Sequence, residues 1–416
     1  MSVALTIKPL KRLTEINREV LPESTPEDFE IEYVDISSVS GMGRILGTET
    51  LLFGKAPSRA RRLVRNGDTI ISTVRTYLRA ITSIQSPPPN LVVSTGFATL
   101  TPGPEIDGGY FAYFAQTEHF IHEVVSRSTG VSYPAITPSE LGNIQISYPP
   151  LATQRRIAAY LDRETRQIDA LVASKEELLG LLAEKRASLI SHAVTRSLNP
   201  KAKLKPSGIP WLGEIPGHWS VAQVGHRYHV DLGKMLDAKK ISGDYLKPYL
   251  RNQDVQWSGI NTAELPQMDI KPGEESRFAL LPGDLLVCEG GECGRCSIWT
   301  ETQECYYQKA LHRLRPRTAR DHSRFFRFLM EVAVTTGVFA SDSNANTIGH
   351  LPAEKFRNYR MVFPPVEEQQ KIADYLFEQE AYFKSLRLNI QTSIALLREK
   401  RGSLIAAAVT GELAVV

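Results

Sequence analysis

PPLATQRRIAAYLDRE (Pro149–Glu164) decides the architecture of this chain, because a close copy, PPVEEQQKIADYLFEQ, begins 215 positions later at Pro364. Residues 149–195 align with residues 364–410 without a gap. The match is strongest at the far end, where LLAEKRASLISHAVT from Leu181 meets LLREKRGSLIAAAVT from Leu396. Such self-similarity indicates an internal duplication.

Each copy predicts one long helix. The Pro pair ends the preceding segment, and about 40 residues follow with no Pro and at most one Gly. Apolar residues then recur at heptad-like spacing, which is typical of a coiled coil. We therefore expect two antiparallel helices, each of which rises roughly 60 Å. The predicted interface comprises Ile157, Leu161, Ile168, Leu171, Leu178, Leu182 and Leu189 in the first copy, and Ile372, Leu376, Phe383, Leu386, Ile390, Leu397 and Leu404 in the second.

The blocks that precede the two helices are also related. YVDISSV at Tyr33 aligns with YLRNQDV at Tyr249, and VRNGDTIIS at Val64 aligns with LLPGDLLVC at Leu280. Short β-branched runs between Gly-Asp and Pro signals predict strands, whereas FAYFAQTEHFIHEVV and RFFRFLMEVAVTT predict helices. Each block is therefore a mixed domain whose scaffold repeats and whose loops differ.

The predicted fold class is α+β, with two similar mixed α/β domains and two long antiparallel coiled-coil helices in a pseudo-two-fold arrangement. The expected boundaries are residues 1–148 for the first domain, 149–199 for the central helix, 200–362 for the second domain and 363–416 for the C-terminal helix. Two related modules held at a set distance suit the reading of two separate half-sites on DNA.

The composition favours a soluble protein. Among 416 residues, 42% are hydrophobic and 23% are charged, and no apolar run is long enough to cross a membrane. The start, MSVALTIKPLKRL, lacks a secretory signal, so we expect a cytoplasmic protein without a membrane partner. The net charge of +3 does not by itself identify a nucleic-acid binder.

The sequence resembles the specificity subunits of type I restriction–modification enzymes. The resemblance rests on PPLATQRRIAAYLD and PPVEEQQKIADYLF, on the two EKRxSLIxxAVT endings, and on SGIPWLGEIPGHW (Ser207–Trp219). The last of these resembles the segment that opens a target recognition domain in this family. The first domain departs from the pattern, because it begins KPLKRLTEINRE and has no WLGEIP counterpart.

The resemblance implies a non-catalytic subunit. Each target recognition domain would read one half of a bipartite site on double-stranded DNA. The helices would set the spacer and dock two methyltransferase subunits, to which two ATP-dependent restriction/translocase subunits can be added. S-adenosylmethionine, ATP and Mg would then belong to the partner subunits, and this chain would hold no cofactor.

The residues agree with that absence of catalysis. The chain has no GxxxxGK[ST] phosphate loop and no recognisable nucleophile context around its His residues. Cys288, Cys293, Cys296 and Cys305 could supply four thiolates to zinc. Their spacing, however, is not that of paired CxxC knuckles, and STVRTYLRA (Ser72–Ala80) in the first domain has no Cys. We therefore expect reduced, partly buried cysteines and no metal.

Candidate DNA contacts are side chains that can neutralise phosphates or reach base edges. In the first domain they lie in KAPSRARRLVR (Lys55–Arg65) and in STVRTYLRA, and in the second domain they occupy comparable places. Arg79 and Arg295 coincide in the alignment, which favours a shared role in positioning the backbone. The candidates are Lys55, Arg59, Arg61, Arg62, Arg75, Tyr77, Arg79, Lys239, Lys240, Asn252, Gln253, Arg295 and Lys309.

Two other functions stay open at this stage. The first is a coiled-coil scaffold whose two modules bind protein partners. The second is a zinc-containing DNA enzyme, which would require the four cysteines to hold a metal.

Overall fold

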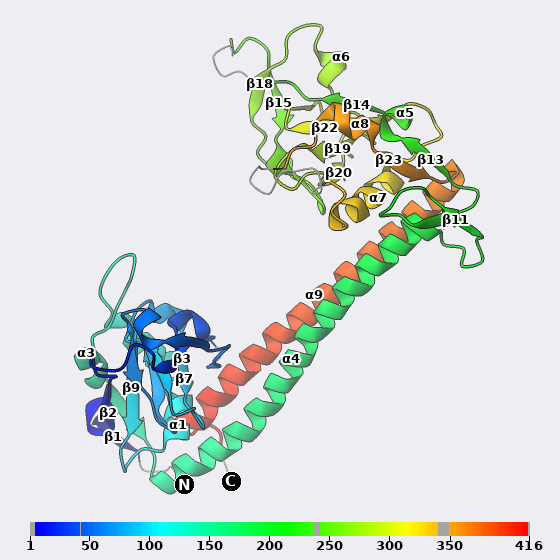
Figure 1. Ribbon diagram of the computed structural model, residues 1–416. Coiled ribbons are helices and arrows are strands. Elements are labelled where there is room, and N and C mark those ends of the chain that lie inside the picture. The colour runs from blue at the N-terminus through cyan, green and yellow to red at the C-terminus, as the bar shows by residue number, and fades with distance from the viewer. Residues whose placement is uncertain (1–4, 42, 237–241, 340–348, 415–416) are drawn as a thin grey trace. The chain divides into compact units, whose positions relative to one another are not determined.

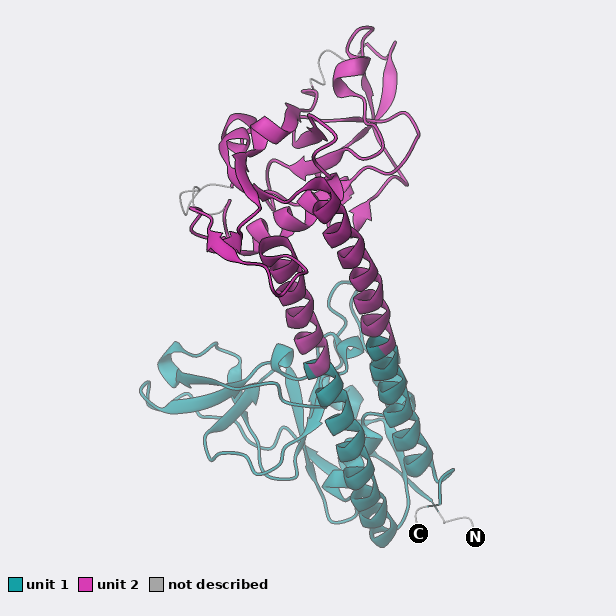
Figure 2. Cartoon of the chain, turned by 90° about the vertical axis from the view of Figure 1, so that its right-hand side faces the viewer, with its two compact units in different colours: residues 1–177, 390–416 teal, residues 178–389 magenta. Residues whose placement is uncertain are grey.

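The computed structural model describes residues 5–41, 43–236, 242–339 and 349–414 (Figure 1). The chain divides into two compact units, one of residues 1–177 and 390–416 and the other of residues 178–389 (Figure 2). The boundary crosses both long helices, α4 (Leu151–Arg196) and α9 (Val366–Thr410). Each unit therefore contains one domain and one part of each helix.

The domain of the first unit is built on two four-stranded sheets. One is antiparallel with the order β2-β9-β6-β7, and the other has the order β4-β3-β8-β5 with a parallel β3-β8 pair. A separate antiparallel pair joins β1 to β10. The strands are β1 (Thr6–Pro9), β2 (Thr14–Ile16), β3 (Glu30–Val34), β4 (Glu49–Leu52), β5 (Ala60–Leu63), β6 (Thr69–Ser72), β7 (Ile81–Ser83), β8 (Leu91–Ser94), β9 (Phe97–Pro102) and β10 (Gln145–Tyr148).

The domain of the second unit repeats the antiparallel sheet and three strands of the second sheet. Its antiparallel sheet has the order β14-β22-β19-β20, its second sheet has the order β18-β15-β21 with a parallel β15-β21 pair, and β13 pairs with β23. The strands are β11 (Leu204–Pro206), β12 (Glu214–Pro216), β13 (Ser220–Gln223), β14 (Tyr228–Leu232), β15 (Leu246–Leu250), β16 (Val255–Gln256), β17 (Gly259–Ile260), β18 (Gln267–Asp269), β19 (Leu285–Cys288), β20 (Cys296–Ile298), β21 (Tyr306–Tyr307), β22 (Leu311–Pro316) and β23 (Arg360–Phe363). The predicted α+β class is confirmed.

Short helices complete both domains. The segment predicted as one helix in the first domain is two helices, because the Thr117 side chain caps a new helix by accepting from the Phe120 amide. The matching segment of the second domain is a single helix, α7. The short α-helices are α1 (Gly108–Phe114), α2 (Glu118–Ser126), α3 (Pro138–Gly142), α5 (Val224–Arg227), α6 (Glu275–Phe278), α7 (Ser323–Thr335) and α8 (Ala353–Asn358). The 3-10 helices are η1 (Leu10–Arg12), η2 (Ile36–Ser38), η3 (Phe53–Lys55), η4 (Thr76–Leu78) and η6 (Asn252–Asp254).

Within each unit the two long helices run antiparallel. In the first unit, Arg398 pairs with Glu176 at 2.7 Å and Arg401 pairs with Asp169 at 3.1 Å, so the residue number rises along one helix as it falls along the other. No described helix combines the length and the hydropathy that crossing a bilayer requires. The pairing of α4 with α9 agrees with the duplication, because each helix carries the same apolar face.

The ends of the long helices lie inside the domain cores. In the first unit, the buried core includes Ile157, Ala158 and Leu161 from the start of α4, together with Ile405, Ala408 and Val409 from the end of α9. In the second unit, the corresponding residues are Ile372, Ala373 and Leu376 from α9, and Ile190, Ala193 and Val194 from α4. All six pairs are separated by 215 positions. The helices are therefore parts of both hydrophobic cores.

The predicted apolar stripe needs one correction. Ile168 and Phe383 are buried, as expected for the helix pair, whereas the side chains of Leu171 and Leu178 are 53% and 46% exposed. Val172 and the half-buried Leu179 take their places, because steps of four, seven and three residues lead from Ile168 through them to Leu182. Leu182, Leu189, Leu386, Ile390, Leu397 and Leu404 are half-buried.

A buried glutamine fixes each domain to the start of its helix. Gln154 accepts from the Asp107 amide at 2.8 Å and donates to the carbonyls of Glu105 and Pro149. Gln369 repeats all three bonds, to the His322 amide at 2.9 Å and to the carbonyls of Arg320 and Pro364. Both side chains are fully buried. The same three bonds in both copies hold the helix to the polypeptide just before α1 or α7.

The end of the WLGEIP segment forms β12, which pairs with β11, and the described strands of the first unit contain no counterpart of this pair. The segment is followed by Trp219, which is buried and donates to Glu368 at 3.0 Å. Glu368 also receives hydrogen bonds from Ser197 at 2.5 Å and from His218 at 2.7 Å. Burial raises the pKa of Glu368, but these three bonds outweigh burial and leave the pKa below its usual value. The carboxylate thus joins the end of α4, this segment and the first turn of α9.

Replacing Gln369 with Ala should lower the free energy of unfolding by about 1–3 kcal/mol, because the substitution leaves a buried amide and two carbonyls without their partner. Gln370 is exposed on the next position of the same helix, so Gln370→Ala is the matched control. Urea unfolding followed by circular dichroism measures both. Equal effects of the two substitutions would contradict the assigned role of Gln369.

Replacing Glu368 with Gln should destabilise the protein at pH 7, and the difference from wild type should shrink as the pH falls from about 5 to 3. The reason is that the pKa of Glu368 is lowered in the folded state, so its stabilisation is present above the unfolded pKa of about 4.3 and is lost as the pH falls through the folded value. Denaturant unfolding at several pH values tests this. The exposed neighbour Glu367 supplies the control, Glu367→Gln, for which no such pH-dependent difference is expected.

Candidate nucleic-acid interface

The first group of candidate DNA contacts lies on η3 and β5 of the first domain. Lys55 and Arg59 are exposed. Arg59 donates to the Tyr33 hydroxyl at 3.2 Å and pairs with Asp35 at 2.8 Å, and these partners, Tyr33 first, raise the pKa of the guanidinium. The guanidinium of Arg61 lies 4.4 Å from the Phe53 ring centroid, and Arg62 donates to the Phe97 carbonyl at 3.0 Å. Lys55 and Arg59 therefore face solvent, whereas Arg61 and Arg62 are half-buried against the domain.

The second group surrounds η4. Arg75, Tyr77 and Arg79 are all exposed, and Tyr77 retains 51% of its accessible surface. Arg75 and Arg79 have left-handed backbone conformations, with φ of 51° and 57°. Arg79 forms a bidentate pair with Glu118, one arm of which measures 2.8 Å. The guanidinium of Arg75 lies 4.5 Å from the ring centroid of Tyr133.

In the second domain, Asn252 and Arg295 contact each other instead of solvent. Arg295 donates to the side-chain oxygen of Asn252 at 2.9 Å and to the Val255 carbonyl at 2.9 Å, and only 15% of its side chain is exposed. Asn252 donates in turn to the Gly290 carbonyl at 3.0 Å. These two residues shape the loop around η6, whereas Gln253 and Lys309 are exposed. Lys239 and Lys240 lie outside the described residues.

The predicted coincidence of Arg79 with Arg295 is wrong by one position. The Ser72 amide donates to the Ala80 carbonyl, and its counterpart, the Cys288 amide, donates to the Arg295 carbonyl. Ala80 is therefore the structural equivalent of Arg295. The turn after β6 is one residue longer than the turn after β19, which ungapped sequence matching cannot detect.

The four cysteines are separate free thiols. Burial raises the pKa of Cys288 to about 11 and that of Cys305 to about 12, and it also raises the pKa of Cys296. Cys293 donates to the Gly349 carbonyl at 2.8 Å. Among the residues that the structure describes, no three His, Cys, Asp or Glu side chains converge as metal ligands. Their environment is that of small packed thiols, which are protonated at neutral pH.

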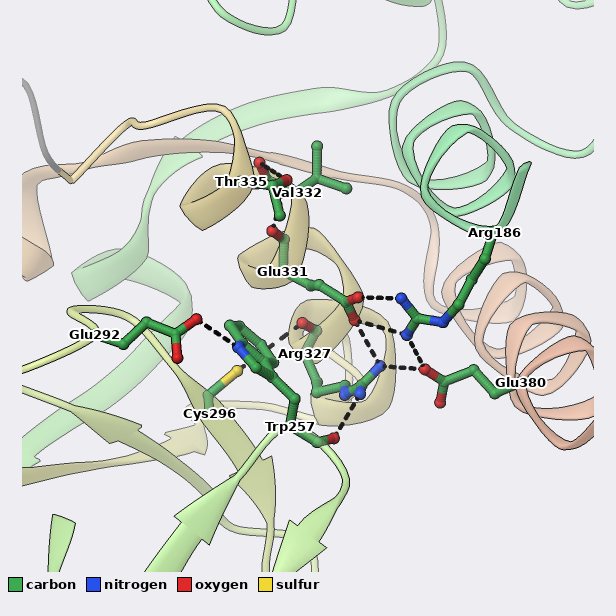
Figure 3. A network of polar contacts seen from close by, with 9 residues as sticks. All are labelled: Arg186, Trp257, Glu292, Cys296, Arg327, Glu331, Val332, Thr335 and Glu380. Carbon is green, nitrogen blue, oxygen red and sulfur yellow. Dashed lines mark hydrogen bonds and ion pairs between the residues drawn. The ribbon is translucent and has the colours of Figure 1, made fainter. Parts of the chain in front are cut away.

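A cluster of four charges connects the long helices to the second domain (Figure 3). Arg186 of α4 pairs with Glu331 of α7 at 2.6 Å and with Glu380 of α9. Arg327 of α7 contacts the same two carboxylates at 3.0 and 3.1 Å. Burial lowers the pKa of Arg186, but its bonds to the two glutamates outweigh burial and raise the pKa above its usual value. Two cations and two carboxylates thus neutralise each other in a half-buried site.

The cluster extends to the loop that carries Asn252. Arg327 donates to the Trp257 carbonyl at 2.8 Å, and the Trp257 indole donates to Glu292 at 2.8 Å (Figure 3). Glu292 lies 3.5 Å from Arg295, which holds Asn252. A continuous set of polar contacts therefore joins the helix pair to a loop of candidate DNA contacts. Sequence reasoning missed Trp257 and Arg327 because their partners are distant in the chain.

The first unit has a related contact at the equivalent arginine. Arg401, which is 215 positions after Arg186, pairs with Asp169 at 3.1 Å, and Asp169 pairs with Arg44 at 2.9 Å. Arg401 also donates to Gln116, which lies between α1 and α2, at 3.3 Å. The repeated EKR motif, whose arginines are Arg186 and Arg401, could have indicated this role.

Comparison with known proteins agrees with this geometry. The model of the type I restriction modification DNA specificity domain matches residues 59–179 and 216–394, which together exceed half of the chain. The EcoKI specificity subunit of Escherichia coli (strain K12) is 23% identical over 323 residues, which cover 76% of this chain and 67% of that protein. The EcoBI specificity subunit of Escherichia coli is 22% identical over 302 residues, which cover 71% of this chain and 64% of that protein.

Solved structures show the same fold. A chain from a structural study of complex assembly and conformational transition in the type I R-M system superposes with a TM-score of 0.76 at 20% identity, over 99% of this chain and 100% of that one. The HsdS subunit from Thermoanaerobacter tengcongensis gives a TM-score of 0.55 at 21% identity, over 98% and 97% of the two chains. The chain therefore belongs to the family of type I restriction–modification DNA specificity subunits.

The family model describes a DNA specificity domain and not a catalytic one. The curated relatives above are likewise specificity subunits. The protein-binding scaffold and the zinc-containing DNA enzyme therefore find no support. Membership of the family implies DNA and other restriction–modification subunits as partners.

Replacing Arg186 with Met should lower the stability of the second unit by about 1–3 kcal/mol, because Glu331 and Glu380 then share the single cation Arg327. The side chain of Arg186 is 31% exposed, so solvent screening keeps the effect below that of a fully buried pair. Lys185→Met, at an exposed neighbouring position, is the control. Denaturant unfolding measures both variants, and an Arg186 effect no larger than the control would contradict the role of the cluster.

Proposed function

We propose that this chain reads a bipartite sequence on double-stranded DNA, with one half read by residues 1–148 and the other by residues 200–362. The observation that carries the proposal is that the family model matches two regions, one over each domain, and that both domains contain a four-stranded antiparallel sheet of equivalent strand order. The loops differ: the turn after β6 carries two arginines, whereas the turn after β19 is one residue shorter. A shared scaffold with different loops suits two different half-sites.

The candidate contacts have different roles in this proposal. Exposed cations and polar side chains neutralise phosphates or reach base edges, and Arg295 and Asn252 position the loop around them. Arg61 and Arg62 support the surface from which Arg59 and Lys55 extend. The proposed direct contacts are Lys55, Arg59, Arg75, Tyr77, Arg79, Gln253 and Lys309, together with Lys239 and Lys240.

The helices of residues 149–199 and 363–416 have two proposed roles, which are to set the spacer and to dock two methyltransferase subunits. Exposed leucines and an exposed tyrosine on these helices are available to a docking partner. Leu171 and Leu178 fit this role better than helix pairing within the chain. The exposed apolar residues of the helices are Leu171, Leu178, Leu181, Tyr382, Leu388 and Leu396.

Catalysis belongs to the partners in this proposal. S-adenosylmethionine binds the methyltransferase subunits, and ATP and Mg bind two restriction/translocase subunits where these are present. The complex acts on chromosomal DNA in the cytoplasm. This chain supplies recognition and assembly.

Exchange of residues 1–148 for the corresponding domain of another family member tests the proposal. In cells that also express the methyltransferase subunits, methylation sequencing should show a motif with one new half and one unchanged half, because each domain reads its own half-site. The exchange must keep Ile157, Leu161 and Gln154, which the incoming core has to contact. An unchanged motif, or a change in both halves, would refute the division of labour.

A further inference from the structure

A protruding loop of the first domain lies beside the turn that carries Arg75. The loop, residues 128–134, connects α2 to α3 and extends away from the strands of its unit (Figure 1). It is closed at its base by a pair of hydrogen bonds between Thr129 and Ala135, each 2.9 Å long. Val131 is fully exposed, and Tyr133 is 62% exposed. Two exposed apolar side chains therefore lie on a loop whose base is held closed by backbone hydrogen bonds.

The loop and the η4 turn form one structural element. The Arg75 amide donates to the Pro134 carbonyl at 2.8 Å, and the hydroxyls of Thr76 and Ser128 are 3.0 Å apart. The guanidinium of Arg75 stacks on the Tyr133 ring, and its Cζ atom lies 4.5 Å from the ring centroid. The contact fixes the direction of the tyrosine and places a positive charge beside the tip. Among residues 5–41, 43–236, 242–339 and 349–414, no carboxylate pairs with Arg75.

The shorter turn of the second domain has glycine at the two corresponding left-handed positions. Gly291 and Gly294 have φ of 72° and 89° and correspond to Arg75 and Arg79, whose φ values are 51° and 57°. Left-handed backbone favours glycine, because a Cβ atom crowds the carbonyl oxygen in this conformation. An arginine there is strained, and such strain gathers at functional sites. The guanidinium, and not the shape of the turn, therefore accounts for arginine at position 75.

We propose that Arg75 and residues 128–134 form a DNA-reading finger, in which the tip enters a groove and contributes to base discrimination within the half-site of the first domain. Val131 offers methyl groups to the C5 methyl of thymine, the apolar contact that a groove provides. Tyr133 supports the tip, and Arg75 orients Tyr133 while its charge faces the phosphates. This inference rests on the proposed function. The corresponding segment of the second domain falls on residues 340–348, outside the described part of the chain.

The test uses the full chain together with its methyltransferase subunits. Methylation sequencing of cells that express the wild-type complex defines the motif. Two duplexes are then compared, one with that motif and one with the first half altered by single base changes. The variants are Val131→Ser, Tyr133→Ala and Arg75→Gly. The control is Ile7→Ser, which also replaces an exposed aliphatic residue with serine; Ile7 lies on β1 and is 66% exposed.

Each finger variant should reduce the preference for the wild-type half-site by about tenfold. The methylated motif should become degenerate in one half only, while Ile7→Ser leaves it unchanged. Arg75→Gly restores the residue type that the second domain uses, so its thermal unfolding temperature should stay at the wild-type value. If Arg75 served only to stabilise the fold, Arg75→Gly would leave the methylated motif unchanged.

Wild-type preference in Val131→Ser and Arg75→Gly, or an equal loss of binding to both duplexes, would overturn the finger while the bipartite reading stands. A wild-type complex that methylates no bipartite motif would overturn the proposed function, and the finger with it. Val131 is fully exposed, so Val131→Ser should fold normally and gives a result even if Tyr133→Ala fails to fold.

Discussion

The structure depends on one constraint, which is that the ends of the long helices are buried inside the domain cores. Three residues from the start of one helix and three from the end of the other complete each core, and the same six positions recur after 215 residues. Burial of a large aliphatic side chain stabilises a fold by roughly 1.5–3 kcal/mol, so these residues bind each domain firmly to the helix pair. Neither domain can therefore move along the helices without opening its own core.

Polar contacts make this attachment specific. Apolar packing alone tolerates small shifts, because it has no preferred direction. Gln154 and Gln369 remove that freedom, since each fully buried side chain satisfies one amide and two carbonyls at fixed positions. In the second unit, the cluster of Arg186, Arg327, Glu331 and Glu380 adds a second point of attachment. It continues through Trp257 to the loop around Asn252, so the loop that presents candidate contacts is tied to the helices.

Much of the scaffold could be predicted from the sequence. The ungapped repeat predicted the two helices, and the aligned motifs predicted two similar mixed α/β domains, because β-branched runs and turn signals act locally. Leu171 and Leu178 show the limit of this reasoning. Both fit a heptad spacing, yet the buried positions are the next residues, Val172 and Leu179, which are also seven apart. Spacing alone does not decide which of two adjacent apolar residues faces the partner helix.

The sequence by itself determined the duplication, the fold class and the family, because these depend on periodicity and on motifs that are contiguous in the chain. Only the tertiary structure decided which candidate side chains face solvent. Arg295 and Asn252 are turned towards each other by partners more than 30 positions away, and Arg75 meets Tyr133 across 58 positions. Such contacts arise from the packing of loops on a shared sheet. A sequence specifies them only through the whole fold, and no local pattern records them.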